Sequence, residues 1–222
     1  MALYKYLFLA SIFMSAHFRA DAQDKRDMRD MHSVGISAAI TSSDTWQLEA
    51  AYHWFPIRYV GIGGGIGFWK QFSTDAVPQG KYWKVNEKYK LPSSLYFRPS
   101  LLFVSPTIIA GNDFSLRLFA EPGLMFGIPY DKACIDVCSD EFLIPYAYQY
   151  ISSTKGNWCF FDSRIGISAR IEPLNISIGY LFSTLDVYSM RRNMSYENIA
   201  FGSFYPEAKN VHGAYMTISF DF

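Results

Sequence analysis

The chain has 222 residues, with 20 Lys and Arg side chains against 20 Asp and Glu. This length corresponds to one domain or at most two, and a net charge of zero gives no electrostatic support for nucleic-acid binding. Half of the residues are hydrophobic and 18% are aromatic, yet no apolar run reaches the roughly 18 residues that a membrane-spanning helix needs.

The N-terminus predicts a cleaved signal peptide over residues 1–22. A basic start, "MALYK", precedes the apolar stretch "YLFLASIFMSAHF", and the small-x-small sequence "ADA" stands before Gln23. The stretch is too short for a membrane anchor. Residues 23–31 are predicted to be a charged leader in the periplasm, followed by a single domain over 32–222.

From residue 32 onward, apolar side chains recur at every second position rather than every third or fourth. In residues 114–128 all even-numbered side chains are apolar, whereas the odd ones include Arg117, Glu121 and two glycines. Because successive side chains of a strand point to opposite faces, this pattern predicts a long strand with one apolar and one polar face.

Eight such segments occur, and short and long connections alternate between them. The predicted strands are 32–40, 45–54, 60–69, 95–103, 114–128, 157–171, 175–182 and 211–222. The long connections are 71–92, 129–156 and 188–209. This arrangement predicts an eight-stranded antiparallel up-and-down transmembrane β-barrel with a filled lumen, tight periplasmic turns and longer external loops.

A soluble β-sandwich is the alternative, because alternation alone also fits a buried apolar face. The export signal, the strand length and the aromatic residues near strand ends favour the barrel, because such aromatics form girdles at both membrane interfaces. The girdle is predicted to include Trp46, Trp54, Phe68, Trp69, Phe97, Phe103, Phe160 and Phe161.

Four stretches resemble a known family: "YVGIGGGIGFWKQF", "FRPSLLF", "FAEPGLMFGIPYDK" and "HGAYMTISFDF". Over about 32–222 the chain resembles small outer-membrane β-barrel proteins of the OmpA/OmpX-like type, a porin-like family of Gram-negative gut bacteria. The resemblance implies a bacterial outer-membrane location, contact with lipid and lipopolysaccharide, and assembly through a final strand that ends at Phe222. It implies architecture and hardly any activity.

Charged residues on the polar faces are predicted to line the lumen in equal numbers of acids and bases. They are Glu49, Arg98, Arg117, Glu121, Asp162, Arg164, Arg170 and Asp221. An eight-stranded barrel is only wide enough for side chains to fill, so we expect an ion-paired network, made of Glu49, Arg98, Arg117, Glu121, Asp162 and Arg164. A small-solute channel, the third hypothesis for function, would need a wider barrel.

The stretch "VGIGGGIGFW" carries five glycines within residues 61–67. A dinucleotide-binding fingerprint needs GxGxxG before a helix, but here the sixth position is Ile66 and no helix follows. Four of the glycines share the lumen face, so we expect them to make room for Arg98, Arg117 or Tyr96 from across the lumen.

Three cysteines remain in the exported chain. Cys134 and Cys138 form a CxxxC pair that lacks the four ligands of a zinc site, and in an exported protein a disulfide between them is favoured over free thiols. Cys159 would then be single. The sequence predicts no cofactor and no metal.

A lipid-directed hydrolase or acyltransferase is the second hypothesis for function. His212 lies near the predicted external rim, where the preceding strand offers Asp186 and Ser183 across a hairpin. A rim histidine that hydrogen-bonds to a neighbour or to water is the simpler interpretation, so we favour a non-enzymatic protein.

The external loops are the favoured binding candidates, because Tyr, Trp and Arg are enriched at binding surfaces. The candidates are Lys81, Tyr82, Trp83, Lys84, Tyr146, Tyr148, Tyr150, Arg191, Arg192 and Tyr205. The alternating tyrosines predict a hairpin that extends above the membrane. The leading hypothesis is therefore a structural or surface-interaction protein that binds a glycan or a protein. The alternative is that the lysines pair with lipopolysaccharide phosphates and the aromatics only pack the loops together.

Overall fold

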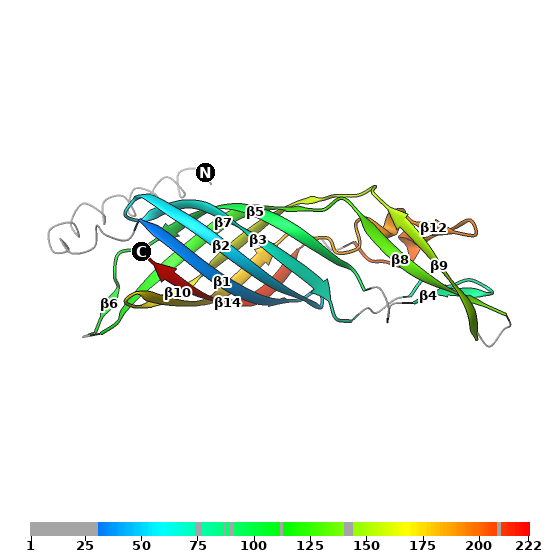
Figure 1. Cartoon of the computed structure of the whole chain (residues 1–222), viewed down its shortest axis with the longest axis horizontal. Helices are drawn as coiled ribbons and strands as arrows, with labels where there is room; N and C mark the ends of the chain where they lie inside the picture. Colours follow the sequence, from blue (N-terminus) through cyan, green and yellow to red (C-terminus); the bar gives the residue numbers. More distant parts are fainter. Residues whose placement is uncertain are drawn as a thin grey trace, which may run out of the picture.

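Eight long strands form a closed antiparallel ring (Figure 1). The computed structural model describes residues 31–73, 77–86, 88, 91–111, 113–139, 144–207 and 210–222, so the predicted signal peptide and all but the last residue of the leader lie outside the described residues. The barrel strands are β1 (His32–Thr41), β2 (Thr45–Ile57), β3 (Val60–Gln71), β5 (Ser93–Val104), β7 (Ser115–Gly127), β10 (Cys159–Ile171), β11 (Leu174–Ser183) and β14 (Val211–Asp221). The ring closes where β14 pairs with β1, which confirms the predicted eight-stranded barrel and rules out the sandwich.

The alternating pattern points apolar side chains outward and polar ones into the lumen. Ile36, Ile66 and Ile165 on the outer face are 61%, 69% and 57% exposed. Strands of 10–13 residues match the length that a tilted strand needs to cross a bilayer. Exposed apolar surface on every strand is unfavourable in water, so this outer belt is suited to lipid.

The two ends of the barrel differ. One end has the tight connection between Ile57 and Val60, the connection with the short strand β6 (Ile109–Ala110), and the chain end at Phe222. This end is called the turn end, and it lies beside the C label in Figure 1. The opposite end continues into further structure. No helix among the described residues is long and apolar enough to cross a membrane.

That further structure is a small sheet packed on a folded loop. The sheet has the order β4-β8-β9, with β4 (Trp83–Val85), β8 (Asp131–Cys138) and β9 (Pro145–Ser153). The loop between β11 and β14 supplies η1 (Arg191–Asn193), β12 (Ser195–Tyr196), β13 (Ile199–Ala200) and η2 (Phe201–Ser203). Together these elements are called the extension (Figure 1). The predicted hairpin above the barrel is thus present as β8 and β9.

One hydrophobic cluster joins the extension to the barrel. From the extension it contains Trp83, Ile135 and Phe201, and from inward-facing barrel positions it contains Trp69, Tyr96, Met125 and Phe160. The lumen at the extension end is therefore filled by apolar side chains. The girdle prediction was wrong for Trp69 and Phe160, which are 7% and 8% exposed, because their positions in the alternation face inward.

Candidate functional site

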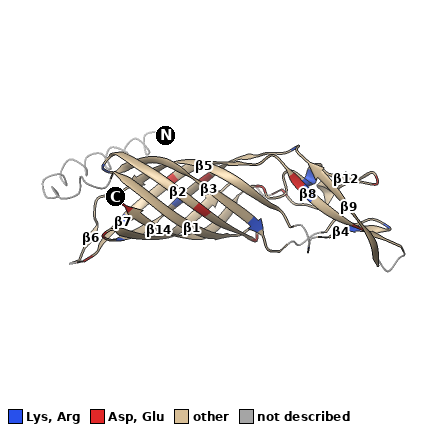
Figure 2. Cartoon of the chain, viewed as in Figure 1, with Lys and Arg blue, Asp and Glu red and all other residues tan. Residues whose placement is uncertain are grey.

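A buried ion-pair network fills the barrel below this apolar cluster. Figure 2 shows acidic and basic positions on barrel strands that are otherwise mostly uncharged. Arg98 on β5 is fully buried, and its Nε and Nη2 donate to the two carboxylate oxygens of Glu49 at 2.9 Å each. Nη2 also donates to Oε1 of Glu121. These are charge-assisted, partly bidentate bonds, which are the strong class of hydrogen bond.

Arg164 on β10 binds the same Glu49 carboxylate from another side. Its Nη1 and Nη2 donate to Glu49 at 2.9 Å each, and Nη1 also lies 3.2 Å from Oγ of Ser37. Oδ1 of Asp162 lies 3.6 Å from Arg98 Nη1 and 3.4 Å from Arg164 Nε. Five of the six predicted network members therefore meet, and strands far apart in sequence are tied together.

A hydrogen-bonded chain joins this network on the side toward the turn end. Ser100 Oγ donates to Glu121 Oε1 at 2.9 Å, and His53 Nε2 lies 3.0 Å from Ser100 Oγ and 3.3 Å from Glu121 Oε1. The sequence pattern puts His53 near a strand end and assigns it no role. Alternation places His53 on the same inward face as Glu49, and this pattern could have predicted that His53 joins the network.

Arg117, the sixth predicted member, lies nearer the turn end than the other five. It is half-buried and lines a cavity there, whereas the carboxylate of Glu121 is bound by Arg98 and Ser100. Arg170 also lines this cavity, and its guanidinium lies 3.9 Å from Asp221. The lumen filling is therefore uneven, dense in the middle and looser toward the turn end.

The glycine row makes room for side chains of adjacent strands. A Cβ at Gly65 would lie 2.6 Å from Cγ of Glu49, and one at Gly67 would collide with the ring of Tyr96. Glu49 and Tyr96 are both paired in register with Gly67, from β2 and β5 respectively. The glycines make room for Tyr96, as predicted. The Tyr96 side chain, however, comes from the neighbouring strand and not from across the lumen.

The outer face of the extension sheet carries three exposed tyrosines. Tyr146, Tyr148 and Tyr150 on β9 are 68%, 55% and 58% exposed. Residues two apart on a strand are separated by roughly 6.6–6.8 Å, so the rings form a row. Beside them, Nζ of Lys132 lies 3.9 Å from the centroid of the Tyr150 ring.

The same face has a polar strip along β4 and β8. Asn86 Nδ2 donates to both carboxylate oxygens of Asp136 at 2.7 and 2.9 Å, and Lys84 is paired in register with Asp136. Lys81 and Tyr82 are exposed nearby in sequence, with Nζ of Lys81 5.0 Å from the Tyr82 ring centroid. Aromatic rings and cations thus share one surface of the extension.

Three predicted loop candidates are buried and do not lie on that surface. Trp83 and Arg191 are fully buried and Tyr205 is 3% exposed, so the prediction that they contact a surface ligand is wrong. They point to the inner side of the sheet, where alternation on β4 places Trp83 beside Phe201. Arg192 is only partly exposed, because it is paired with Asp186.

Arg191 fastens the folded loop to β8. Its Nε donates to Oδ2 of Asp131 at 2.8 Å. Burial alone would lower the pKa of Arg191, but the Asp131 carboxylate and Tyr205 together outweigh it and hold this pKa above its ordinary value. The charge is therefore kept inside the extension as a structural tie.

The cysteines are free thiols, so the predicted disulfide is wrong. Cys134 and Cys138 stand four residues apart on one extended strand, which separates their Cα atoms by about 13 Å. A disulfide needs about 4.4–6.8 Å. Burial raises the pKa of the Cys134 thiol, and the nearby Asp136 carboxylate adds to this rise.

His212 does not meet Ser183 or Asp186. It stands opposite Phe182 on β11, is exposed on the outer face, and its Nδ1 is hydrogen-bonded to the hydroxyl of Tyr180. Ser183 is fully buried on the opposite face. The predicted juxtaposition was wrong because the strand alternation separates residues 182 and 183. Among the described residues, no group of three or more His, Cys, Asp or Glu side chains is arranged to hold a metal ion.

The solved structures that resemble this chain are β-barrels with low sequence identity and low TM-scores. Neisserial surface protein A is 10% identical, with a TM-score of 0.42 over 86% of this chain and 96% of that chain. A major outer membrane protein from Thermus thermophilus is 12% identical, with a TM-score of 0.46 over 86% and 98%. The outer membrane enzyme PagL is 10% identical, with a TM-score of 0.38 over 86% and 99%. No family model and no curated protein sequence matches the chain.

Proposed function

We propose that this protein is a non-enzymatic outer-membrane barrel that presents the extension as a recognition surface for an extracellular glycan or protein. The single observation that carries the proposal is the row of Tyr146, Tyr148 and Tyr150, exposed beside Lys132 on a sheet whose other face is fully packed. Tyr offers a large contact area at low entropic cost because its ring has few rotatable bonds.

The outer apolar belt and the predicted signal peptide over 1–22 support a location in the bacterial outer membrane. In this arrangement the turn end faces the periplasm and the extension faces outward, where the lower rim contacts lipopolysaccharide. Phe222 directly follows the last barrel strand, and its ring stacks on His32 at 5.6 Å, a position suited to the proposed role in assembly by the barrel-assembly machinery.

The packing of the lumen favours this function over the two others. Apolar side chains such as Trp69 and Met125 fill the extension end, and the ion-pair network lies below them, which opposes passive diffusion. The hydrolase hypothesis depended on His212 near Ser183, and these side chains lie on opposite faces.

Binding to arrayed ligands tests the proposal. Mature protein in lipid nanodiscs is applied to immobilised polysaccharides in one arm and to extracellular-matrix proteins in the other. We expect saturable binding in one arm, and at least about tenfold weaker binding by the Tyr146→Ser/Tyr148→Ser variant, because aromatic anchors commonly contribute 2 kcal/mol or more. Tyr130→Ser, an exposed tyrosine outside the row, is the control. Absence of binding in both arms, or equal loss in the control, would contradict the proposal.

A further inference from the structure

A cavity of about 240 Å³ occupies the lumen between the ion-pair network and the turn end. Glu49, Arg98 and Arg164 line it on the side of the network, and residues of the turn end, such as Pro56 and Arg58, line it on the other side. The apolar cluster at the barrel mouth lies beyond the network. Within the described part of the chain, the cavity is therefore closed toward the extension and accessible from the turn end.

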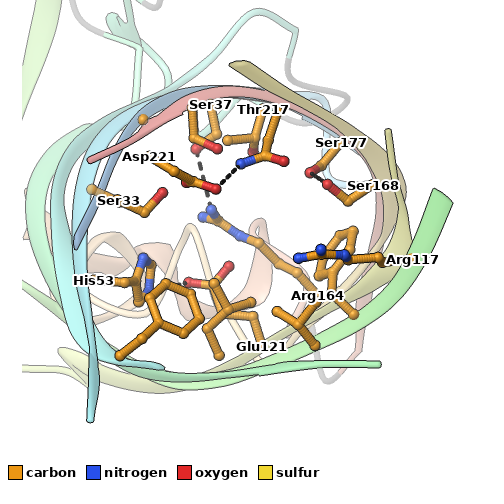
Figure 3. Close-up of a pocket in the computed structure, with 18 of the residues that line it drawn as sticks. Ser33, Ser37, His53, Arg117, Glu121, Arg164, Ser168, Ser177, Thr217 and Asp221 are labelled. Carbon is orange, nitrogen blue, oxygen red and sulfur yellow. Dashed lines mark hydrogen bonds and ion pairs between the residues drawn. The ribbon is translucent and has the colours of Figure 1, made fainter. Parts of the chain in front are cut away.

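One wall of the cavity carries a row of hydroxyl groups on four neighbouring strands. Ser168 on β10 is paired in register with Ser177 on β11. Thr217 on β14 is paired with both Ser177 and Ser37, and Ser37 belongs to β1. Figure 3 shows these four residues along one side of the lumen, with Glu121 on the opposite side. Because neighbouring strands lie about 4.8 Å apart, the hydroxyl row extends over roughly 14 Å of the wall.

Several hydroxyls that line the cavity are available to a bound molecule. Ser33 is 7% exposed and Ser219 and Thr217 are half-buried, and the side chains of these three make no hydrogen bond to another described residue. Tyr215 is 5% exposed, and its hydroxyl also has no hydrogen-bond partner among the described residues. Buried polar groups nearly always have a partner, so these hydroxyls point to a molecule inside the cavity.

The charged groups around the cavity are already compensated. Arg170 lies 3.8 Å from Glu172 and 3.9 Å from Asp221, and Arg58 and Arg117 also interact with other groups of the protein. The guanidiniums and carboxylates of the ion-pair network neutralise one another. A ligand with a net charge would lose its hydration without gaining a counter-charge, so the cavity is suited to a neutral molecule.

The wall that faces the hydroxyl row is apolar. It is formed by Leu102 and Val104 on β5 and by Phe119 on β7, strands that lie across the ring from β14 and β1. The Phe119 ring meets that of Tyr215 edge-on at 5.9 Å. Contact with apolar surface is unfavourable for water, whereas the C–H groups of an organic molecule are stabilised against it. The two walls together fit a molecule that has both hydroxyls and a C–H face.

We propose that the cavity binds a small neutral polyhydroxylated molecule, of the size of a monosaccharide, that enters from the turn end. Its hydroxyls exchange hydrogen bonds with Ser33, Thr217 and Ser219, and its C–H face lies against Leu102 and Phe119. A hydroxyl both donates and accepts, so a wall of hydroxyls matches a ligand that carries hydroxyls. The volume is below the roughly 300–1,000 Å³ of sites for drug-sized ligands, which limits the ligand to a small molecule. The site is at the opposite end of the molecule from the tyrosine row and does not rest on the proposed function.

Ligand-observed NMR of mature protein in nanodiscs, with empty nanodiscs as the blank, tests this proposal. The neutral probes are glucose and galactose, and each is matched with its uronate and its amino sugar, which differ from it mainly in charge. Cyclohexanol keeps a six-membered ring with a single hydroxyl. We expect saturable binding of at least one neutral sugar. Its two charged analogues should bind at least about tenfold more weakly, because the cavity offers no counter-charge, and cyclohexanol should also bind more weakly.

Variants locate the binding. Thr217→Val keeps the side-chain shape and removes one hydroxyl, so it is expected to weaken sugar binding about fivefold through the loss of one hydrogen bond. Thr154→Val is the same substitution at an exposed position of the extension and should change nothing. If Thr217→Val does not fold, Ser177→Leu, which fills part of the cavity, is expected to abolish binding instead. Folding is scored by heat-modifiable migration on gels.

Three results would overturn the inference. They are absence of saturable binding by either neutral sugar, binding of a charged analogue as tight as that of its neutral parent, and equal affinities for the cavity variant and Thr154→Val. The Tyr146→Ser/Tyr148→Ser variant separates this site from the extension. It should bind the neutral sugar as the unmodified protein does, and loss of binding there would place the sugar on the extension and also overturn the inference.

Discussion

The barrel and the extension use the same period-two pattern with opposite polarity. In the barrel, apolar side chains such as Ile36 and Ile66 face outward and the charges of Glu49 and Arg98 are buried. In the extension, Trp83 and Ile135 are buried and the tyrosines of β9 face outward. The difference shows that the surroundings decide which face is buried: lipid covers the apolar face of the barrel, whereas above the membrane only protein can cover it.

The two interiors therefore depend on different forces. The barrel interior is held by mutual compensation of buried charges, so it is sensitive to the loss of one partner. The extension interior is held by apolar contact, so it is sensitive to the loss of volume. Substitutions can break either region separately.

Arg98→Met should have the largest effect. It removes the donor shared by Glu49 and Glu121 and leaves buried carboxylates without full compensation, which is expected to lower the free energy of unfolding by about 3–5 kcal/mol. Urea titration in lipid vesicles, followed by tryptophan fluorescence, measures this change.

The same change at Arg192 serves as the control. Arg192 pairs with a single carboxylate, that of Asp186, and its side chain is 20% exposed, so Arg192→Met should cost less than Arg98→Met, about 1–3 kcal/mol. Equal effects of the two substitutions would contradict the view that the lumen network is the more sensitive charge cluster.

Trp83→Ala should unfold the extension and leave the barrel intact. Trp83 is fully buried against Phe201 and Tyr196, and truncation of a buried aromatic costs about 3–5 kcal/mol. Limited proteolysis should cut β8 and β9 rapidly, while migration of the barrel on unheated gels stays unchanged. Loss of both regions together would show that they form one cooperative unit. Tyr82→Ala, the exposed neighbour, is the control.

Gly63→Val should impair the barrel alone. A Cβ at Gly63 would meet the backbone oxygen of Tyr52 and lie 2.8 Å from Cα of His53. Overpacking of this kind costs about 1–3 kcal/mol, and we expect slower folding into vesicles with no change in the proteolysis of the extension. Folding of the variant at the normal rate would show that the backbones of β2 and β3 can move apart enough to accommodate the valine side chain.

Tyr196→Phe should have a small effect confined to the extension. The Tyr196 hydroxyl donates to Oε1 of Gln149 at 2.5 Å and links the folded loop to β9, so its removal should cost at most about 1 kcal/mol. Hydrogen exchange of β9 amides would register it. A change in barrel amides instead would contradict the separation of the two regions.

Chemical labelling of the cysteines is the mildest test, because it needs no substitution in the protein. A maleimide should label Cys159 rapidly in the folded protein, and Cys134 and Cys138 only after denaturation, since both are buried and the Cys134 pKa is raised. Thiolate is the reactive form, so a raised pKa shifts labelling of Cys134 to higher pH. A mass that is about 2 Da lower without reductant would instead indicate a disulfide.

Predictions from sequence succeeded where local alternation was sufficient. The alternation placed five charged residues on inward faces, because the direction of a side chain depends only on its position along the strand. These residues are Glu49, Arg98, Glu121, Asp162 and Arg164. It could not show that Arg98 and Arg164 share Glu49 while Arg117 lies apart, since this depends on register between strands. The juxtaposition of His212 with Ser183 was wrong for a different reason, because alternation itself places these two residues on opposite faces.

The sequence by itself determined the closed barrel, its outward apolar belt and the inward charges, because period two and connection lengths are local properties. Only the tertiary structure decided that the long loops share one core with the barrel mouth, that Trp83 and Arg191 are buried there, and that a cavity is left at the turn end. These features arise where segments distant in sequence meet, and no local pattern encodes which of their faces will touch.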